Sequence, residues 1–197
     1  MSFRIEKKLF IKKGNLLEFK EILKINEVKN LYPKRNIQSI YFDNLEKKMY
    51  LDSIEGVTPR KKIRIRNYPE TKNSEFLFET KISSVEGRFK KNFKILLNEY
   101  NKYLKWGIFD KDYGQCKPIL NIIYDREYFI KEDVRITIDT NIRYSSYKSK
   151  VFSNDINIVV ELKTNRNKDI DILFKEFPFQ EIRFSKYCNG IEHLNLN

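Results

Sequence analysis

Residues 61–66 read Lys-Lys-Ile-Arg-Ile-Arg, and this alternation decides the fold. The two isoleucines fall on one face of a strand, because successive side chains of a strand point to opposite faces. Lys62, Arg64 and Arg66 fall on the other face. The stretch therefore predicts a strand with one apolar face and one densely charged face.

The same period of two residues recurs along most of the chain. Further strands are predicted over residues 3–11, 38–43, 75–82, 88–95, 119–129, 134–139 and 156–163. Their polar positions hold mostly Arg, Lys and Glu rather than the Ser, Thr and Asn that are common on a solvated sheet. Helical spacing predicts helices over 15–28, over 98–106 and after Ser185.

Two architectures fit about eight such strands. The commoner one is an antiparallel sheet whose charged face lies in water. The other is a closed barrel whose charged face surrounds an anion, since clustered buried cations are costly unless an anion balances them. We favour the second: a mainly antiparallel α+β fold with a roughly eight-stranded tunnel barrel, a charged interior, helices outside and the C-terminal helix near the tunnel end. One domain over 1–197 is expected.

The charge balance indicates an anionic ligand. Lys and Arg total 39 against 27 for Asp and Glu, a net charge of +12 over 197 residues. The six glycines form neither G-x-x-x-x-G-K-[ST] nor G-x-G-x-x-G, so a glycine-rich phosphate loop is excluded. Any phosphate must be held mainly by side chains.

Scarce residues exclude other classes. A single histidine, His193, excludes a His-rich zinc site. Cys116 and Cys188 are far apart and in no C-x-x-C, which is typical of reduced structural thiols and predicts a cytoplasmic protein. No stretch is long and apolar enough for a membrane span.

The charged positions supply what a row of phosphates needs. Arginine forks hold phosphate oxygens, lysines act as point charges, and carboxylates hold a hard divalent cation. The forks are Arg64, Arg66, Arg126 and Arg135; the point charges are Lys8, Lys81, Lys90, Lys163 and Lys186; the carboxylates are Glu6 and Glu161. The alternative for each residue is a surface ion pair or a solvated lysine, which contributes little to the stability of the fold.

In their order and spacing, these motifs resemble the VTC domain, the polyphosphate polymerase module of the triphosphate tunnel metalloenzyme (CYTH-like) superfamily. The resemblance covers residues 3 to 193. It rests on Arg4-Ile5-Glu6-Lys7-Lys8, Ser39-Ile40-Tyr41-Phe42-Asp43, Arg64-Ile65-Arg66, Phe78-Glu79-Thr80-Lys81, Gly87-Arg88-Phe89-Lys90, Lys117-Pro118, Tyr124-Asp125-Arg126, Arg135-Ile136-Thr137-Ile138-Asp139, Val160-Glu161-Leu162-Lys163 and Phe184-Ser185-Lys186-Tyr187. The chain departs from the family at Leu9, often an aromatic, and at Asn92, often an arginine.

The resemblance implies an enzyme that transfers phosphoryl groups along a triphosphate or polyphosphate, most simply polyphosphate synthesis from ATP. It implies catalytic roles for Arg64, Arg66, Lys81 and Lys186. Phosphate-binding roles fall to Lys8, Lys90, Arg126, Arg135, Lys163 and Ser185. Glu161, with Glu6 as the weaker candidate, would bind Mn²⁺ or Mg²⁺.

Other functions stay open. The same barrel could act as a tripolyphosphatase or nucleoside triphosphatase, or bind polyphosphate without turnover. A nucleic-acid binder ranks last, because the aromatics fall mainly on the phase opposite to the basic residues and not among them as a stacking surface needs. Coupling to a membrane process would require a separate membrane partner. The oligomeric state is not predicted.

Overall fold

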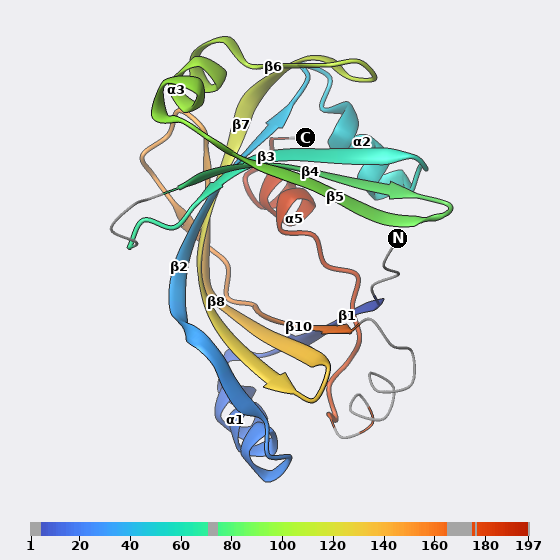
Figure 1. The fold of residues 1–197 in the computed structure, drawn as a ribbon, viewed down its shortest axis with the longest axis vertical. Coiled ribbons are helices and arrows are strands. Elements are labelled where there is room, and N and C mark those ends of the chain that lie inside the picture. Colours follow the sequence, from blue (N-terminus) through green and yellow to red (C-terminus); the bar gives the residue numbers. More distant parts are fainter. Residues whose placement is uncertain (1–4, 71–74, 165–174, 176, 197) are drawn as a thin grey trace. The chain divides into compact units, whose positions relative to one another are not determined.

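The computed structural model describes residues 5–70, 75–164, 175 and 177–196 (Figure 1). Arg4 of the first motif lies outside them. The described elements are β1 (Ile5–Ile11), the 3₁₀ helix η1 (Lys13–Asn15), α1 (Leu16–Ile25), β2 (Lys29–Asp43), α2 (Lys48–Glu55), β3 (Arg60–Asn67), β4 (Phe76–Ser84), β5 (Gly87–Ile95), α3 (Leu97–Trp106), β6 (Ile108–Asp110), β7 (Gly114–Lys131), β8 (Val134–Ser146), β9 (Ser153–Asn154), β10 (Ile158–Thr164) and α5 (Lys186–His193). None of the helices within these residues is long and apolar enough to cross a bilayer.

The mainly antiparallel α+β class is confirmed. Strands follow the order β1-β10-β8-β7-β2-β3-β4-β5, with β6 beside β7 and β9 beside β8. Antiparallel register joins β1 to β10, β10 to β8, β2 to β3, β3 to β4, β4 to β5 and β6 to β7. β1 and β5 are the two ends of this order, so the described pairings do not close the sheet, and the closed barrel expected from the sequence is not confirmed.

The chain divides into two compact units. Unit 1 takes the described residues of Met1–Arg35, Tyr124–Ile142 and Asn154–Phe184, and unit 2 takes those of Asn36–Ile123, Arg143–Ser153 and Ser185–Asn197. The long strands β2, β7 and β8 contribute residues to both units. The single domain over 1–197 stays a prediction.

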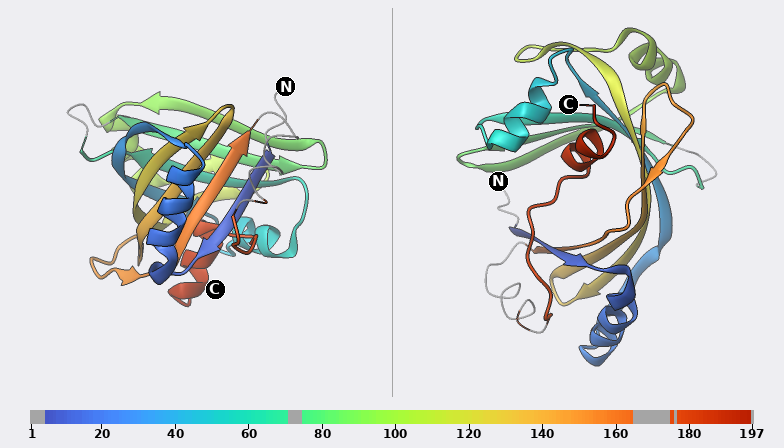
Figure 2. Two further views of the ribbon diagram at one scale, coloured as in Figure 1. Left: turned by 90° about the horizontal axis from the view of Figure 1, so that it is seen from below. Right: turned by 180° about the vertical axis from the view of Figure 1, so that it is seen from behind.

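In unit 1, α1 covers the apolar face of β1, β10 and β8 (Figure 2). Phe19 and Leu23 of the helix are buried against this face, and the ring of Phe177 lies 5.1 Å from that of Phe19. The strands contribute Leu9, Ile11, Val134, Ile136, Ile138, Ile158, Val160 and Leu162. Because side chains alternate along each strand, the charged positions of the same three strands fall on the opposite face.

In unit 2, helices lie on both faces of the β2–β5 segment. α3 stacks Tyr100 on Phe76 of β4 with ring centroids 4.0 Å apart, and Tyr103 lies 5.6 Å from Phe78. These four rings occupy the apolar side. On the polar side, α5 begins at Ser185, whose Oγ accepts a hydrogen bond from Lys62 of β3.

Most predicted elements are confirmed. The helices expected over 15–28, over 98–106 and after Ser185 correspond to α1, α3 and α5. α2, β6 and β9 were not predicted. β2 begins at Lys29, whereas the sequence predicted a start near residue 38. The sequence missed residues 29–36 because they are mostly exposed or half-buried and so show no clear apolar alternation.

The turn that joins α3 to β6 depends on a glycine. Gly107 has a φ of 84°, and a Cβ there would lie 2.3 Å from the Cys116 carbonyl oxygen. Gly114 also has a positive φ, 69°, but a Cβ there would meet nothing within 4 Å. Both positions favour glycine, and Gly107 adds a close approach to β7 that Gly114 lacks.

We expect Gly107→Ala to lower the free energy of unfolding by about 3 kcal/mol, since it adds a backbone clash to a conformation, φ 84° and ψ −166°, that is almost confined to glycine. Gly114→Ala should cost only about 1 kcal/mol, the conformational penalty alone. Urea denaturation of both variants measures the difference. Equal losses would mean that the contact with β7 does not constrain the turn.

Candidate functional site

The polar face of unit 1 aligns charged side chains in rows across three strands. The register pairs Lys8 of β1 with Glu161 of β10, and Glu161 with Thr137 of β8. The next row pairs Glu6 with Lys163, and Lys163 with Arg135. Arg135 therefore joins the predicted site residues by register.

Ion pairs link these residues into what we call the Glu161 cluster: Glu6, Lys8, Arg126, Asp139, Glu161 and Lys163. Lys163 Nζ lies 2.5 Å from Glu161 Oε1 and 3.4 Å from Glu6 Oε2. Lys8 Nζ lies 3.0 Å from Glu6 Oε1 and donates to the Phe184 carbonyl oxygen at 2.7 Å. Two carboxylates thus share one ammonium group.

Arg126 enters the Glu161 cluster from β7. Its guanidinium donates from Nε and Nη2 to the two oxygens of Asp139, at 2.5 and 2.6 Å, and Nη2 lies 3.7 Å from Glu161 Oε2. Burial alone would lower the pKa of Arg126, but Asp139 together with Tyr124 and Glu161 holds that pKa well above its ordinary value. Asp139, which the sequence analysis did not select, fixes the orientation of the fork.

Glu161 is buried and ionised. Burial by itself raises its pKa, but Lys163, then Arg126 and Lys8, hold the pKa well below its ordinary value of 4.5. A carboxylate that stays charged when buried is suited to bind a cation. Glu6 stands beside it as a second oxygen donor.

The donor set of the Glu161 cluster fits a hard divalent cation. Glu6 and Glu161 both face the Lys163 ammonium, so their oxygens converge on a point where positive charge is already stabilised. No group of three or more His, Cys, Asp or Glu suited to a metal occurs among residues 5–70, 75–164 and 177–196. Water and phosphate oxygens would have to complete the coordination shell.

A second group of charged residues lies on the polar face of unit 2, and we call it the Glu79 cluster: Arg64, Arg66, Glu79 and Lys90. Arg64 Nε donates to Glu79 Oε2 at 2.6 Å, and Arg66 Nη1 lies 3.9 Å from the same oxygen. Lys90 pairs with Glu79 Oε1. Glu79 carries one negative charge, so by itself it balances one of these three cations.

The two arginines of the Glu79 cluster are buried, at 7% exposure each. Arg64 Nη1 donates to the Tyr41 hydroxyl at 2.7 Å, and Arg66 Nε lies 3.5 Å from Ser39 Oγ. Both partners come from β2, directly opposite in register. This burial contradicts the alternative of a solvated charged face for these two positions.

The pKa values in this cluster reflect a positive environment. Burial alone would raise the pKa of Glu79, but Arg64, then Arg66 and Lys90, hold it far below 4.5. Burial lowers the pKa of Lys90, Glu79 opposes that shift, and Arg64 and Arg66 add to it. The two arginines therefore help to lower the pKa of the lysine that shares their carboxylate.

A row of three lysines extends from Lys90 of the Glu79 cluster across the neighbouring strands. The register places Lys62 opposite Lys81, and Lys81 opposite Lys90, on three consecutive strands. Like charges directly opposite each other destabilise a sheet. Lys81 was selected from the sequence as a site residue, and it is exposed. Lys62 was not selected, although its alternation with Ile63 places it on the charged face of the same strand as Arg64.

The start of α5 lies at the same face. Lys62 Nζ donates to Ser185 Oγ at 2.9 Å and lies 3.7 Å from Cys188 Sγ. Ser185 caps the helix by accepting from the Cys188 backbone N–H at 3.3 Å. Lys186 is the first residue of the helix and is half-buried.

Asp43, the last residue of the Ser39–Asp43 motif, has a structural role. It accepts hydrogen bonds from the backbone N–H groups of Met49 and Tyr50, at 3.0 Å each, and from the Tyr187 hydroxyl. Burial raises its pKa despite these bonds. Asp43 thereby holds α2 and α5 to the end of β2, and Tyr187 stacks on Tyr41, the partner of Arg64.

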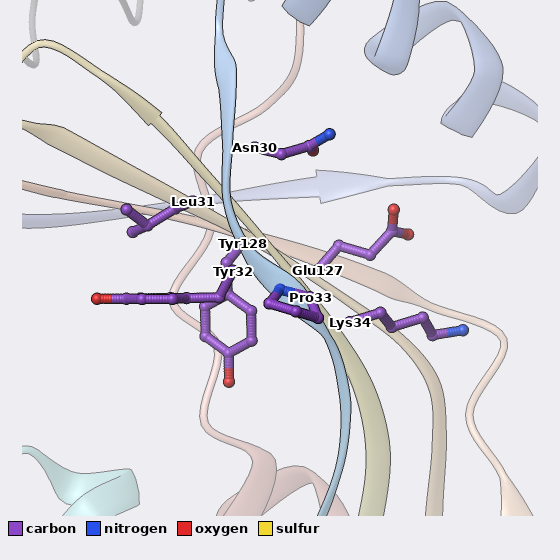
Figure 3. A pocket seen from close by; sticks show the side chains of 7 residues that line it. All are labelled: Asn30, Leu31, Tyr32, Pro33, Lys34, Glu127 and Tyr128. Carbon is purple, nitrogen blue, oxygen red and sulfur yellow. The ribbon is translucent and has the colours of Figure 1, made fainter.

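One pocket lies on unit 1 and shares no residue with the Glu161 cluster (Figure 3). It has a volume of about 470 Å³ and is lined by Asn30, Leu31, Tyr32, Pro33, Lys34, Glu127 and Tyr128. Its basic side chain, Lys34, pairs with Asp125 at 3.0 Å. This mostly uncharged lining does not suit a polyanion, so the candidate site is assigned to the charged clusters.

A family model identifies the chain. The VTC domain model matches residues 3–114 and 108–195. The chain belongs to the VTC domain family. Comparison with curated proteins gives no match.

Solved structures share the fold of this VTC domain at low sequence identity. A proposed adenylate cyclase from Bacillus halodurans is 16% identical with a TM-score of 0.67, covering 98% of both chains. A protein from Pyrococcus horikoshii is 17% identical with a TM-score of 0.63, covering 97% of this chain and 99% of that one. A proposed adenylyl cyclase from Hippeastrum, described as having a dominant triphosphatase activity, is 14% identical with a TM-score of 0.63, covering 98% and 96%.

The depressed pKa values give a pH prediction. A carboxylate with a folded-state pKa below its unfolded value stabilises the fold above the unfolded pKa, and this stability is lost as the pH falls. We expect the free energy of unfolding to fall as the pH drops below about 4.5, the ordinary value for Glu79 and Glu161.

Glu79→Gln should lower stability at pH 7 by about 3–5 kcal/mol, because it leaves buried cations without this partner. The free energy of unfolding of this variant should also depend less on pH below about 4.5 than that of the unsubstituted protein. Denaturant titrations between pH 3 and 7 measure both effects. An unchanged pH slope in Glu79→Gln would show that Glu79 is not held ionised by its neighbours.

Proposed function

We propose that this VTC domain performs metal-dependent phosphoryl transfer on a triphosphate or polyphosphate held in the basic tunnel that its family implies. The main reaction proposed is polyphosphate synthesis from ATP. The observation that carries the proposal is the Glu79 cluster, where buried Arg64 and Arg66 and the exposed Lys90 share one carboxylate. Such a group is best explained by an anion that binds beside it.

The geometry favours an extended anion over a single phosphate. Neighbouring strands lie about 4.8 Å apart, so the row Lys62, Lys81 and Lys90 spans about 10 Å. Several phosphoryl groups can face a row of that length. Arg64 and Arg66 would supply forks beside it, and Ser185 and Lys186 would add donors at the start of α5.

A divalent cation belongs to this proposal. Glu161, with Glu6, would hold Mg²⁺ or Mn²⁺, which when bound would neutralise phosphate charge. Lys163 would move from the two carboxylates to a phosphate oxygen. Lys8 and Arg126, both within the Glu161 cluster, and Arg135 beside Lys163 in register would bind further oxygens.

The acid–base properties of the clusters favour an anionic acceptor. Glu79 and Glu161 have pKa values held well below 4.5, so both are weak bases at neutral pH. A phosphate acceptor is already ionised and needs no strong base, whereas water does. The residues present would therefore position the donor phosphoryl group, neutralise its charge and orient the attacking oxygen. This favours chain growth over hydrolysis.

Two alternatives have specific support. A tripolyphosphatase or nucleoside triphosphatase is supported by the triphosphatase activity described for the Hippeastrum protein of similar fold. A binding module without turnover is supported by the Lys163 ammonium, which takes the place between Glu6 and Glu161 that a cation would need. We place the protein in the cytoplasm with ATP as its donor, propose no nucleic-acid ligand, and assign any link to membrane transport to a separate membrane partner.

Phosphorus NMR of the protein with ATP and Mn²⁺, with metal chelated before acquisition, tests the proposal. We expect an internal-phosphate signal to grow together with ADP. Orthophosphate alone would establish the hydrolase instead, and an unchanged ATP spectrum would favour the binding module.

Two substitutions test the assigned residues in the same assay. Arg66→Ala and Lys186→Ala should each lower the rate about 100-fold or more, as expected when a donor to developing charge is removed. Lys24→Ala, which removes an exposed lysine paired only with its helical neighbour Glu21, should leave the rate unchanged. Full activity in both site variants would contradict the assignment.

A further inference from the structure

Two large aromatic side chains, three residues apart in the sequence, stand exposed on unit 2. Trp106, the last residue of α3, is 61% exposed, and Phe109 in β6 is 76% exposed. Single exposed hydrophobic residues are common, but large aromatics exposed this close together in the chain are suited to an interaction surface. Neither residue belongs to the charged clusters.

The backbone beneath these aromatics is tightly fixed. The Trp106 carbonyl oxygen accepts hydrogen bonds from Lys117 Nζ and Gln115 Nε2, both at 2.6 Å. Gly107 packs against the Cys116 carbonyl, and Phe109 lies opposite Gln115 in the β6–β7 register. Figure 1 shows α3, β6 and the start of β7 together in unit 2. The two rings are therefore presented by a rigid turn.

Three exposed lysines lie on α3 and β7, the elements that flank the two rings. Lys102 and Lys105 are exposed on the solvent side of α3, and Lys105 Nζ lies 5.0 Å from the centroid of the Trp106 ring. Lys117 is exposed on β7. The neighbouring acidic residues, Asp110 and Asp112, both pair with Lys61, so they do not cancel this charge.

We propose that Trp106, Phe109, Lys102, Lys105 and Lys117, which we call the Trp106 surface, dock on an anionic lipid bilayer. The indole ring is suited to the headgroup level, and the phenyl ring would enter the acyl boundary. Lysines near an anionic leaflet add attraction, each about equally, without requiring a fixed partner. The surface would hold the protein at a membrane.

The presence of lysines rather than arginines favours a lipid surface over nucleic acid as the ligand of the Trp106 surface. Recognition of bases and of individual phosphates relies heavily on arginine forks, and the Trp106 surface, as defined, contains lysines only. Point charges on flexible stems suit the diffuse charge of a lipid surface. The proposal is independent of the proposed phosphoryl transfer, because the two share no residue.

The test uses the full chain and large unilamellar vesicles of phosphatidylcholine, with or without phosphatidylglycerol. Trp106 is the one tryptophan of the sequence, so the intrinsic tryptophan emission reports this surface alone. We expect a blue shift and co-flotation with anionic vesicles, and neither with pure phosphatidylcholine. Micromolar tripolyphosphate, which would occupy a phosphate site, should leave the shift in place.

Phe109→Ser should weaken vesicle binding about tenfold or more, through loss of buried apolar area. A Lys105→Glu and Lys117→Glu double variant should weaken it at least as much on anionic vesicles. The control is Ile25→Ser, which removes an exposed apolar residue from α1. This variant should bind vesicles as the unsubstituted protein does.

Four results would overturn the proposal. They are the absence of a blue shift, equal binding by Phe109→Ser and the unsubstituted protein, a shift produced by single-stranded RNA but not by vesicles, and a concentration-dependent shift without lipid that marks self-association. Loss of vesicle binding with retained ATP turnover in Phe109→Ser would support the Trp106 surface and leave the catalytic proposal standing by itself.

Discussion

Burying a cation costs several kcal/mol unless a nearby negative charge balances it, and this constraint governs both polar faces of the molecule. Each face holds a buried glutamate, Glu161 in unit 1 and Glu79 in unit 2. Each carboxylate is held ionised by cations on neighbouring strands. Because strand register fixes which residues meet, the apolar alternation that builds the sheet also assembles the charged clusters.

The buried polar network around α5 links the helix to the Glu79 cluster. Asp43 at the end of β2 binds the first turn of α2 and the Tyr187 hydroxyl, while Tyr187 stacks on Tyr41. Tyr41 in turn accepts a hydrogen bond from Arg64. The arginine fork is therefore positioned by a chain of contacts that extends into the terminal helix, and that helix begins with Ser185 and Lys186.

The sequence predicted the strands well where one face is apolar, since period two is unmistakable at residues such as Ile63 and Ile65. It predicted less well where a strand is exposed on both sides, as in residues 29–36 of β2. The candidate phosphate-binding residues were selected by their shared phase, but Lys62, Asp139 and the central position of Glu79 were not. Those three depend on cross-strand register, which pairs residues far apart in the chain.

The central claim is that the buried cations form a binding site for a polyanion. Calorimetric titration with tripolyphosphate at constant ionic strength, without metal, tests it directly, with Arg64→Ala as the comparison. The account predicts saturable binding with one tripolyphosphate per chain, which Arg64→Ala weakens at least tenfold. Weak, unsaturable binding that the substitution leaves unchanged would contradict it, and the clusters would then be structural ion pairs.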